Sequence, residues 1–78
     1  MNTLKLKLKR LEKNLTQKCT AKAIGTSTKT YCLKEGGKSE FDRTEIVSLI
    51  ILLNLSDEDV MEIFFNDEIT KRQLNAAK

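Results

Sequence analysis

The chain has 78 residues, of which 40% are hydrophobic and 32% are charged, with no proline and no histidine. This length fits one small domain with a single core, and this composition excludes a disordered chain. Two cysteines without any histidine exclude a disulfide framework and a zinc site built from the usual ligands.

The formal net charge of +3 is divided unevenly along the chain. Residues 1–43 hold eleven Lys or Arg against four acids, whereas residues 44–78 hold three against seven. A basic first half is typical of a surface that faces a polyanion, although a solvated surface without a partner has the same composition. The longest apolar run, residues 46–53, is far shorter than the ~20 residues that span a bilayer. We therefore expect a cytoplasmic protein that makes no membrane contact.

The first segment, residues 4–14, is rich in leucine and lysine and allows two interpretations. A strand would explain the alternation of Leu4, Leu6 and Leu8. A helix would instead place on one face the residues Leu4, Leu8, Leu11 and Leu15. We prefer the helix, because this segment holds good helix formers and no β-branched residue before its end.

Two short helices follow, separated by a single glycine. The first is expected to begin after the capping residue Thr16 and to end at Gly25 in a left-handed conformation. The second is expected over residues 28–35, with Ser27 or Thr26 as its cap and a glycine pair after its last turn.

A fourth helix is expected to open at Asp42 or Thr44 and to close at Asn54. One side of this helix carries an apolar stripe of Ile46, Leu49, Ile50 and Leu53, so we expect it to be the central core helix. Ser56 then caps a fifth helix, whose inward residues are expected to be Val60, Ile63 and Phe64. The polar remainder, residues 67–78, predicts a tail or a frayed helix after a domain spanning residues 1–66.

The glycine between the second and third helices suggests how these two are arranged. A helix, a glycine turn and a second helix form a helix-turn-helix, which presents its second helix to the major groove of DNA. Ala21, four residues after Gln17, supplies the small side chain that lets the two helices approach closely.

Three segments carry a resemblance to a known family: "LTQKCTAKAIGTST", "YCLKEGGKSEF" and "LSDEDVMEIFF". Over residues 4–65 the chain resembles the Cro-like phage repressors, which are helix-turn-helix domains of the lambda-repressor type. The resemblance implies an all-α fold of five helices, with the helix-turn-helix at helices two and three. Thr20 and Thr26 stand where the family usually has aliphatic residues, and Lys34 where many members have Ile or Leu. A buried threonine needs a partner such as a carbonyl of its own helix.

The exposed face of the third helix is the expected contact with base edges, through Thr28, Lys29, Cys32 and Leu33. The resemblance implies that Thr28, Lys29 and Leu33 reach bases and that Gln17 lies beside a phosphate. Further backbone contacts are expected from residues flanking that face, namely Lys18, Lys22, Ser27, Lys38 and Arg43. The resemblance also implies a structural ion pair between Arg10 and Glu35.

The expected function is a sequence-specific DNA-binding transcriptional regulator, a small phage or prophage repressor that occupies an operator in double-stranded DNA. It is expected to act as a homodimer, because two recognition helices about 34 Å apart multiply the specificity of one. Candidates for the dimer interface are Met61, Phe64 and Phe65. The alternative is a protein-interaction module, such as an antitoxin or anti-repressor, that uses its acidic C-terminal half.

No catalytic constellation is recognisable in the sequence, and we expect no enzyme, no small-molecule substrate, no metal and no cofactor. Cys19 and Cys32 allow a redox switch, since Cys32 lies on the expected DNA face. We prefer to interpret both cysteines as small residues without such a role.

Overall fold

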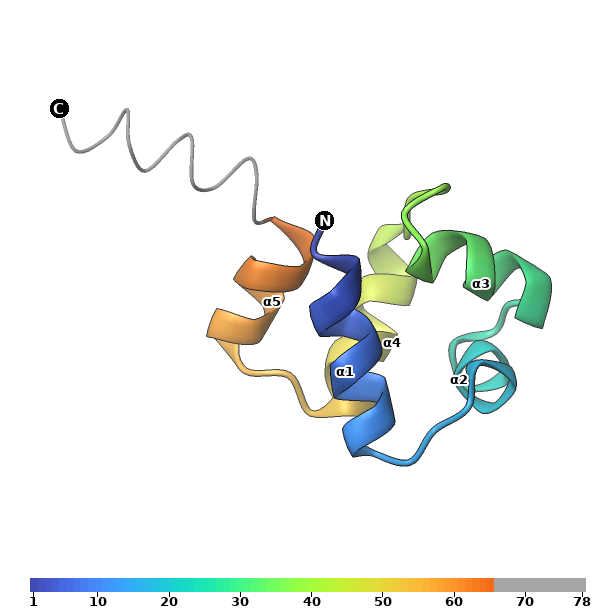
Figure 1. Ribbon diagram of the computed structural model, residues 1–78, viewed down its shortest axis with the longest axis horizontal. Coiled ribbons are helices and arrows are strands. Elements are labelled where there is room, and N and C mark those ends of the chain that lie inside the picture. Colours follow the sequence, from blue (N-terminus) through green and yellow to red (C-terminus); the bar gives the residue numbers. More distant parts are fainter. Residues whose placement is uncertain (66–78) are drawn as a thin grey trace, which may run out of the picture.

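The computed structural model describes residues 1–65, which form five α-helices and no strand (Figure 1). Their bounds are α1 Thr3–Glu12, α2 Gln17–Ile24, α3 Thr28–Glu35, α4 Arg43–Leu53 and α5 Asp57–Phe64. The prediction of an all-α protein with five helices is therefore confirmed for this part of the chain. The expected tail, residues 67–78, lies outside the described residues.

Side-chain caps explain where these helices begin. The residue before each helix accepts a hydrogen bond from the backbone N–H three residues on, and the five caps are Asn2, Thr16, Ser27, Asp42 and Ser56. The structure thus selects Ser27 over Thr26 and Asp42 over Thr44. Gly25 ends α2 with φ +82°, in the left-handed region that glycine adopts without a steric penalty.

The first helix is correctly predicted as a helix, but its buried face is not the row of leucines. Leu4, Leu8 and Leu11 are 65%, 50% and 48% exposed, whereas Leu6 is fully buried and Arg10 nearly so. The physical reason is that Leu6 and Arg10 lie one turn apart on the same face. Since Arg10 is paired inside the molecule, that face turns inward and the leucine row turns out.

The core lies where the inner faces of the helices meet. Tyr31 and Leu49 are fully buried, and Tyr31 contacts the Phe41 ring at a centroid distance of 5.9 Å. The other buried apolar residues are Leu6, Ala21, Ile24, Leu53, Leu55 and Ile63. α4 supplies two of these core residues, but its opposite side is open, since Ile51 is 75% exposed. In Figure 1, α1 and α5 lie on one side of this core and α2 and α3 on the other.

Two polar residues that depart from the family pattern, the buried Thr20 and the partly buried Lys34, have partners in the fold. The Thr20 hydroxyl donates to the Thr16 carbonyl at 2.9 Å, which is the bond to its own helix that the sequence predicts. Lys34 Nζ lies 2.6 Å from Glu45 Oε1. Because Glu45 also closes the capping box with Asp42, the Lys34 pair joins the end of α3 to the start of α4.

Ion pairs join α1 to α5, and they are centred on Asp59. Lys5 Nζ lies 3.2 Å and Lys9 Nζ 3.4 Å from this carboxylate, which also accepts the backbone N–H of Ser56 at 3.1 Å. The Ser56 N–H is the main cause that lowers the pKa of Asp59 from 3.8 to about 2, with Lys5 contributing. A carboxyl group with a lowered pKa stabilises the fold above its unfolded pKa, and this stabilisation disappears as the pH falls.

We therefore expect Asp59→Asn to be less stable than the wild type at neutral pH, with a difference that closes between pH 3.8 and about 2. Thermal unfolding followed by circular dichroism across this range measures the difference. Asp57→Asn is the matched control, because Asp57 is exposed on the same first turn. A difference between Asp59→Asn and wild type that is independent of pH would contradict this role for the ionised carboxylate.

Candidate nucleic-acid interface

The second and third helices pack directly on each other through small and apolar side chains. Ala21 is 1% exposed and Ile24 8% exposed on the inner side of α2. The turn between the helices is fixed by hydrogen bonds to α2, because the Gly25 and Thr26 N–H groups donate to the carbonyls of Lys22 and Ala21. The α3 helix therefore starts at a defined position relative to α2.

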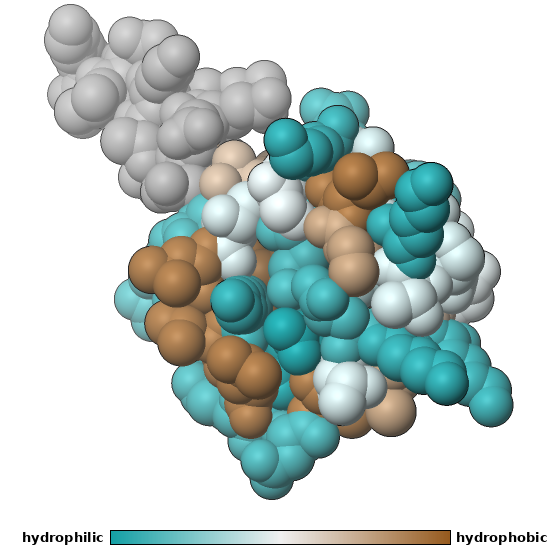
Figure 2. Space-filling view, turned by 45° about the vertical axis from the view of Figure 1, so that its right-hand side comes forward, coloured by the Kyte–Doolittle hydropathy of each residue, from teal (hydrophilic) through white to brown (hydrophobic). Residues whose placement is uncertain are grey.

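The outer face of α3 carries three of the four residues expected to contact bases. Thr28 and Lys29 are exposed, and Leu33 is 40% exposed. Tyr31 and Glu35 point the other way and are buried, so they fix the helix from inside. Figure 2 turns the α2 and α3 side of the molecule forward and shows hydrophilic surface around a small apolar area there.

Cys32, the fourth expected base contact, is only partly exposed, and its thiol is engaged within the protein. The Sγ donates to Gln17 Oε1 at 3.0 Å, which turns this side chain toward α2. The exposed part of α3 that is free for another molecule is therefore the arc of Thr28, Lys29 and Leu33. Cys19, in contrast, is exposed on α2.

A buried carboxylate, Glu35, connects the three N-terminal helices. Arg10 approaches it with two nitrogens, at 2.7 Å for Nε and 3.2 Å for Nη2. The Tyr31 hydroxyl donates to the same carboxylate at 2.7 Å, and Gln17 Nε2 donates at 3.1 Å. The ion pair between Arg10 and Glu35 is thus part of a larger network, and Arg10 Nη1 also donates to the Leu15 carbonyl at 2.6 Å.

Hydrogen bonding keeps this buried carboxylate ionised. Burial alone would raise the pKa of Glu35, but the donors Arg10, Tyr31 and Gln17 outweigh it and lower that pKa. The pKa of Tyr31 is raised, first by burial and then by its hydrogen bond to Glu35. No buried side-chain nitrogen or oxygen among the described residues lacks a hydrogen-bond partner. The network therefore holds α3 without leaving a polar group unpaired.

Gln17 belongs to this joint between α2 and α3, a role that the sequence analysis missed. Its amide nitrogen donates to Glu35 and its amide oxygen accepts from Cys32, so both ends of the side chain are used within the protein. A signal was present in the sequence. Cys32 and Glu35 are three residues apart and share one side of α3, where the first residue of α2 can reach both.

The basic residues expected to flank the site are on the surface. Lys18, Lys22, Lys38 and Arg43 are all exposed, and none forms an ion pair with another described residue. Ser27 is also exposed, and its hydroxyl accepts the Thr30 N–H as the cap of α3. Within residues 1–65, these four cations can therefore pair with an external anion without first breaking an ion pair.

The residues expected at a dimer interface differ in their exposure. Met61 is 46% and Phe65 37% exposed at the end of α5. Phe64 is partly buried, with its ring at 90° to the Phe41 ring and a centroid distance of 6.0 Å. Phe64 therefore contributes mainly to packing within the monomer, while Met61 and Phe65 are open to solvent.

Residues 2–67 match the family described as Protein of unknown function (DUF739). The chain belongs to this family. The match covers all five helices of this DUF739 chain, including the complete α2–α3 unit and the Glu35 network. A search of curated proteins gave no match, and a search of solved structures gave none either.

The described residues contain no group of three or more His, Cys, Asp or Glu side chains that could hold a metal ion. Within the same part of the chain, no helix is long and apolar enough to cross a membrane.

Proposed function

We propose that this protein is a sequence-specific DNA-binding transcriptional regulator that inserts α3 into the major groove of double-stranded DNA. The observation that carries the proposal is the two-sided character of α3. Its outer arc of Thr28, Lys29 and Leu33 is free, while Tyr31 and Glu35 anchor its inner side. A helix that contacts bases in the major groove must be rigid and must have a free polar face. The side chains of such a helix are already positioned before binding.

The finer fold assignment is part of this proposal. Five helices in this order, with a left-handed Gly25 between α2 and α3, support an arrangement of the lambda-repressor type. The resemblance to Cro-like phage repressors supports the same arrangement. On this basis the protein acts in the cytoplasm of a bacterial or phage-infected cell, where it occupies an operator as a homodimer. Met61 and Phe65 are the exposed candidates for its dimer contact.

The chemistry of the outer arc fits the base edges of the major groove. The Lys29 ammonium can donate to the acceptors of guanine, the Thr28 hydroxyl can donate or accept, and Leu33 can contact a thymine methyl group. Lys18, Lys22, Lys38 and Arg43 supply charge to phosphates, which adds affinity without sequence information. The two groups of residues predict different responses to mutation.

Lys29→Ala is expected to weaken binding to the preferred site by about 1–3 kcal/mol, or about 5- to 150-fold, and to weaken binding to random DNA much less. Fluorescence anisotropy titrations with both duplexes at the same salt concentration measure the two losses. Lys22→Ala is the matched control, and it should weaken both complexes alike and reduce the salt slope by about 0.9. An equal loss on both duplexes for Lys29→Ala would assign Lys29 to the backbone.

A second candidate function is favoured by one specific observation, the leucine row of α1. Leu4, Leu8 and Leu11 form an exposed apolar face on α1. Figure 2 shows a column of hydrophobic residues at the left of the molecule. Exposed apolar patches often mark protein contacts, which would suit an antitoxin or anti-repressor.

A mobility-shift titration separates these two functions. Salt-sensitive and sequence-dependent retardation of duplex DNA supports the regulator. Absence of DNA binding at low salt, together with a stable protein complex that Leu8→Glu abolishes, supports the interaction module.

A further inference from the structure

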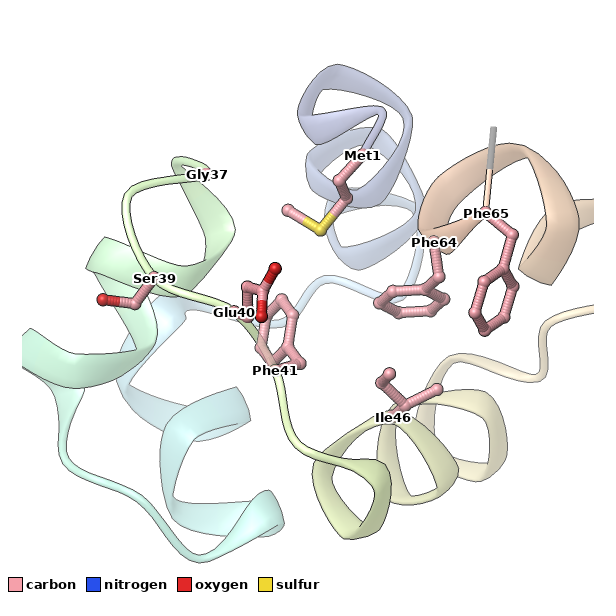
Figure 3. Close-up of a pocket in the computed structure, with 8 residues that line it drawn as sticks. All are labelled: Met1, Gly37, Ser39, Glu40, Phe41, Ile46, Phe64 and Phe65. Carbon is pink, nitrogen blue, oxygen red and sulfur yellow. The ribbon is translucent and has the colours of Figure 1, made fainter. Parts of the chain in front are cut away.

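A pocket of about 390 Å³ lies on the side of the molecule where the loop from α3 to α4 passes the end of α5 (Figure 3). Its lining residues are Met1, Gly37, Ser39, Glu40, Phe41, Ile46, Phe64 and Phe65. All three phenylalanines of the chain are among them. Three of the four aromatic side chains of this protein therefore line one pocket, which lies outside the candidate nucleic-acid interface.

The walls of this pocket combine aromatic rings with polar surface and are partly open to solvent. Phe41 and Phe64 are held in the edge-to-face pair already described, and Phe65 is 37% exposed. Figure 3 shows these rings and Ile46 around one space, with the Met1 side chain above it. Rings fixed by packing lose little entropy when a ligand binds, so the pocket is formed in advance.

Glu40 is the only acid or base among the side chains that the described residues contribute to this lining. It is exposed, and it forms neither a hydrogen bond nor an ion pair with the described part of the chain. In Figure 3 its carboxylate lies beside the Phe41 ring, on the side of Met1. A carboxylate next to aromatic rings attracts a cation to this part of the pocket.

We propose that this pocket binds an alkylammonium cation. The aromatic rings and Ile46 favour methyl or methylene groups, while the Glu40 carboxylate and the rings attract a positive charge that carries such groups. The volume lies near the lower end for ligand sites, which fits a small head group.

The same cationic group could belong to a free small molecule or to a lysine side chain of a protein. The proposal does not depend on DNA binding, because it uses none of the residues on the outer arc of α3. Its experiment therefore succeeds or fails separately from the proposed function.

The test is an NMR titration of the full chain with choline chloride, compared with sodium chloride at equal ionic strength. Choline should produce saturable shifts at the Ile46 methyl groups and at the amides of Glu40 and Phe41. The neutral isostere of choline, with carbon in place of nitrogen, should bind about tenfold more weakly. An acetylated and amidated trimethyllysine serves as the second probe, and tighter binding of this probe than of choline identifies a protein side chain as the source.

Glu40→Gln should weaken choline binding by about tenfold while leaving the neutral isostere unaffected. Because Glu40 is exposed and has no hydrogen bond or ion pair to residues 1–65, this variant should fold, and an unchanged urea midpoint verifies it. Glu58→Gln, an exposed acid on the first turn of α5 outside the lining, is the matched control. Absence of saturable shifts, equal binding of choline and its isostere, or no effect of Glu40→Gln would each overturn the proposal.

Discussion

Replacing Arg10 by methionine is expected to lower the free energy of unfolding by about 3–5 kcal/mol, because it leaves the Glu35 carboxylate buried without its cation. Glu35 is 4% exposed and Arg10 5% exposed, and two nitrogens of Arg10 donate to the carboxylate. The Leu15 carbonyl loses its side-chain donor in the same variant. For a domain of this size such a loss approaches the whole stability. Urea unfolding followed by circular dichroism measures it.

The matched control for this change is Lys5→Met, which removes another cation from α1. Lys5 pairs with Asp59 and Glu62 at the surface, where solvent screens ion pairs and they contribute little to stability. The double variant Arg10→Met, Glu35→Met should regain only part of the loss. No buried charge remains in it, but the buried Tyr31 hydroxyl loses its acceptor. Arg10→Met and Lys5→Met variants of equal stability would show that the Glu35 network does not hold α1 to α3.

Leu6→Ala is expected to destabilise the protein by about 2–5 kcal/mol, whereas Leu8→Ala should cost less than about 1 kcal/mol. The two substitutions remove the same atoms from the same helix, two residues apart. Leu6 has no exposed surface, so its removal leaves a cavity, while Leu8 is 50% exposed and leaves none. Urea titrations with a common denaturant slope give both free energies.

This comparison tests which face of α1 is buried. A larger loss for Leu8→Ala than for Leu6→Ala would mean that the leucine row packs against the core or against another molecule. Each variant replaces leucine with alanine inside α1, so the change in helix propensity is the same in both. The two substitutions can therefore be compared directly.

Local signals in the sequence were sufficient to locate the helices. Thr16 and Ser56 were recognisable as caps because a short polar side chain there accepts a backbone N–H. For the fourth helix the sequence left Asp42 and Thr44 as alternatives, and the structure has Asp42. Gly25 was recognisable as a helix end because glycine adopts the left-handed conformation easily, and its φ is indeed positive. The partner of Thr20 also followed from the sequence, because a buried hydroxyl in a helix bonds to the carbonyl four residues before it.

The face of α1 could not be predicted in the same way. Leucines at positions 4, 6, 8 and 11 lie on several sides of the helix, so their spacing alone does not select one. The inward face is decided by Arg10, whose partner Glu35 is 25 residues away. The convergence of three phenylalanines on one pocket has the same origin, because Phe41 and Phe64 come from distant segments that meet only in the folded chain.

Part of the candidate site was also accessible from the sequence. Thr28, Lys29 and Leu33 were expected on the exposed face of the third helix, and all three are exposed on α3. Cys32 and Gln17 were harder to place, because their hydrogen bond depends on how closely α2 and α3 pack. Both side chains now belong to the joint that positions the interface.

Selection of bound sequences from a random pool of DNA duplexes tests the central claim most directly. If the outer arc of α3 reads the major groove, the pool should converge on one motif, with half-sites about one helical turn apart if the protein binds as a dimer. The Lys29→Ala variant should then relax that motif at one position of each half-site. A pool that remains random after selection with the folded wild-type protein would contradict the claim.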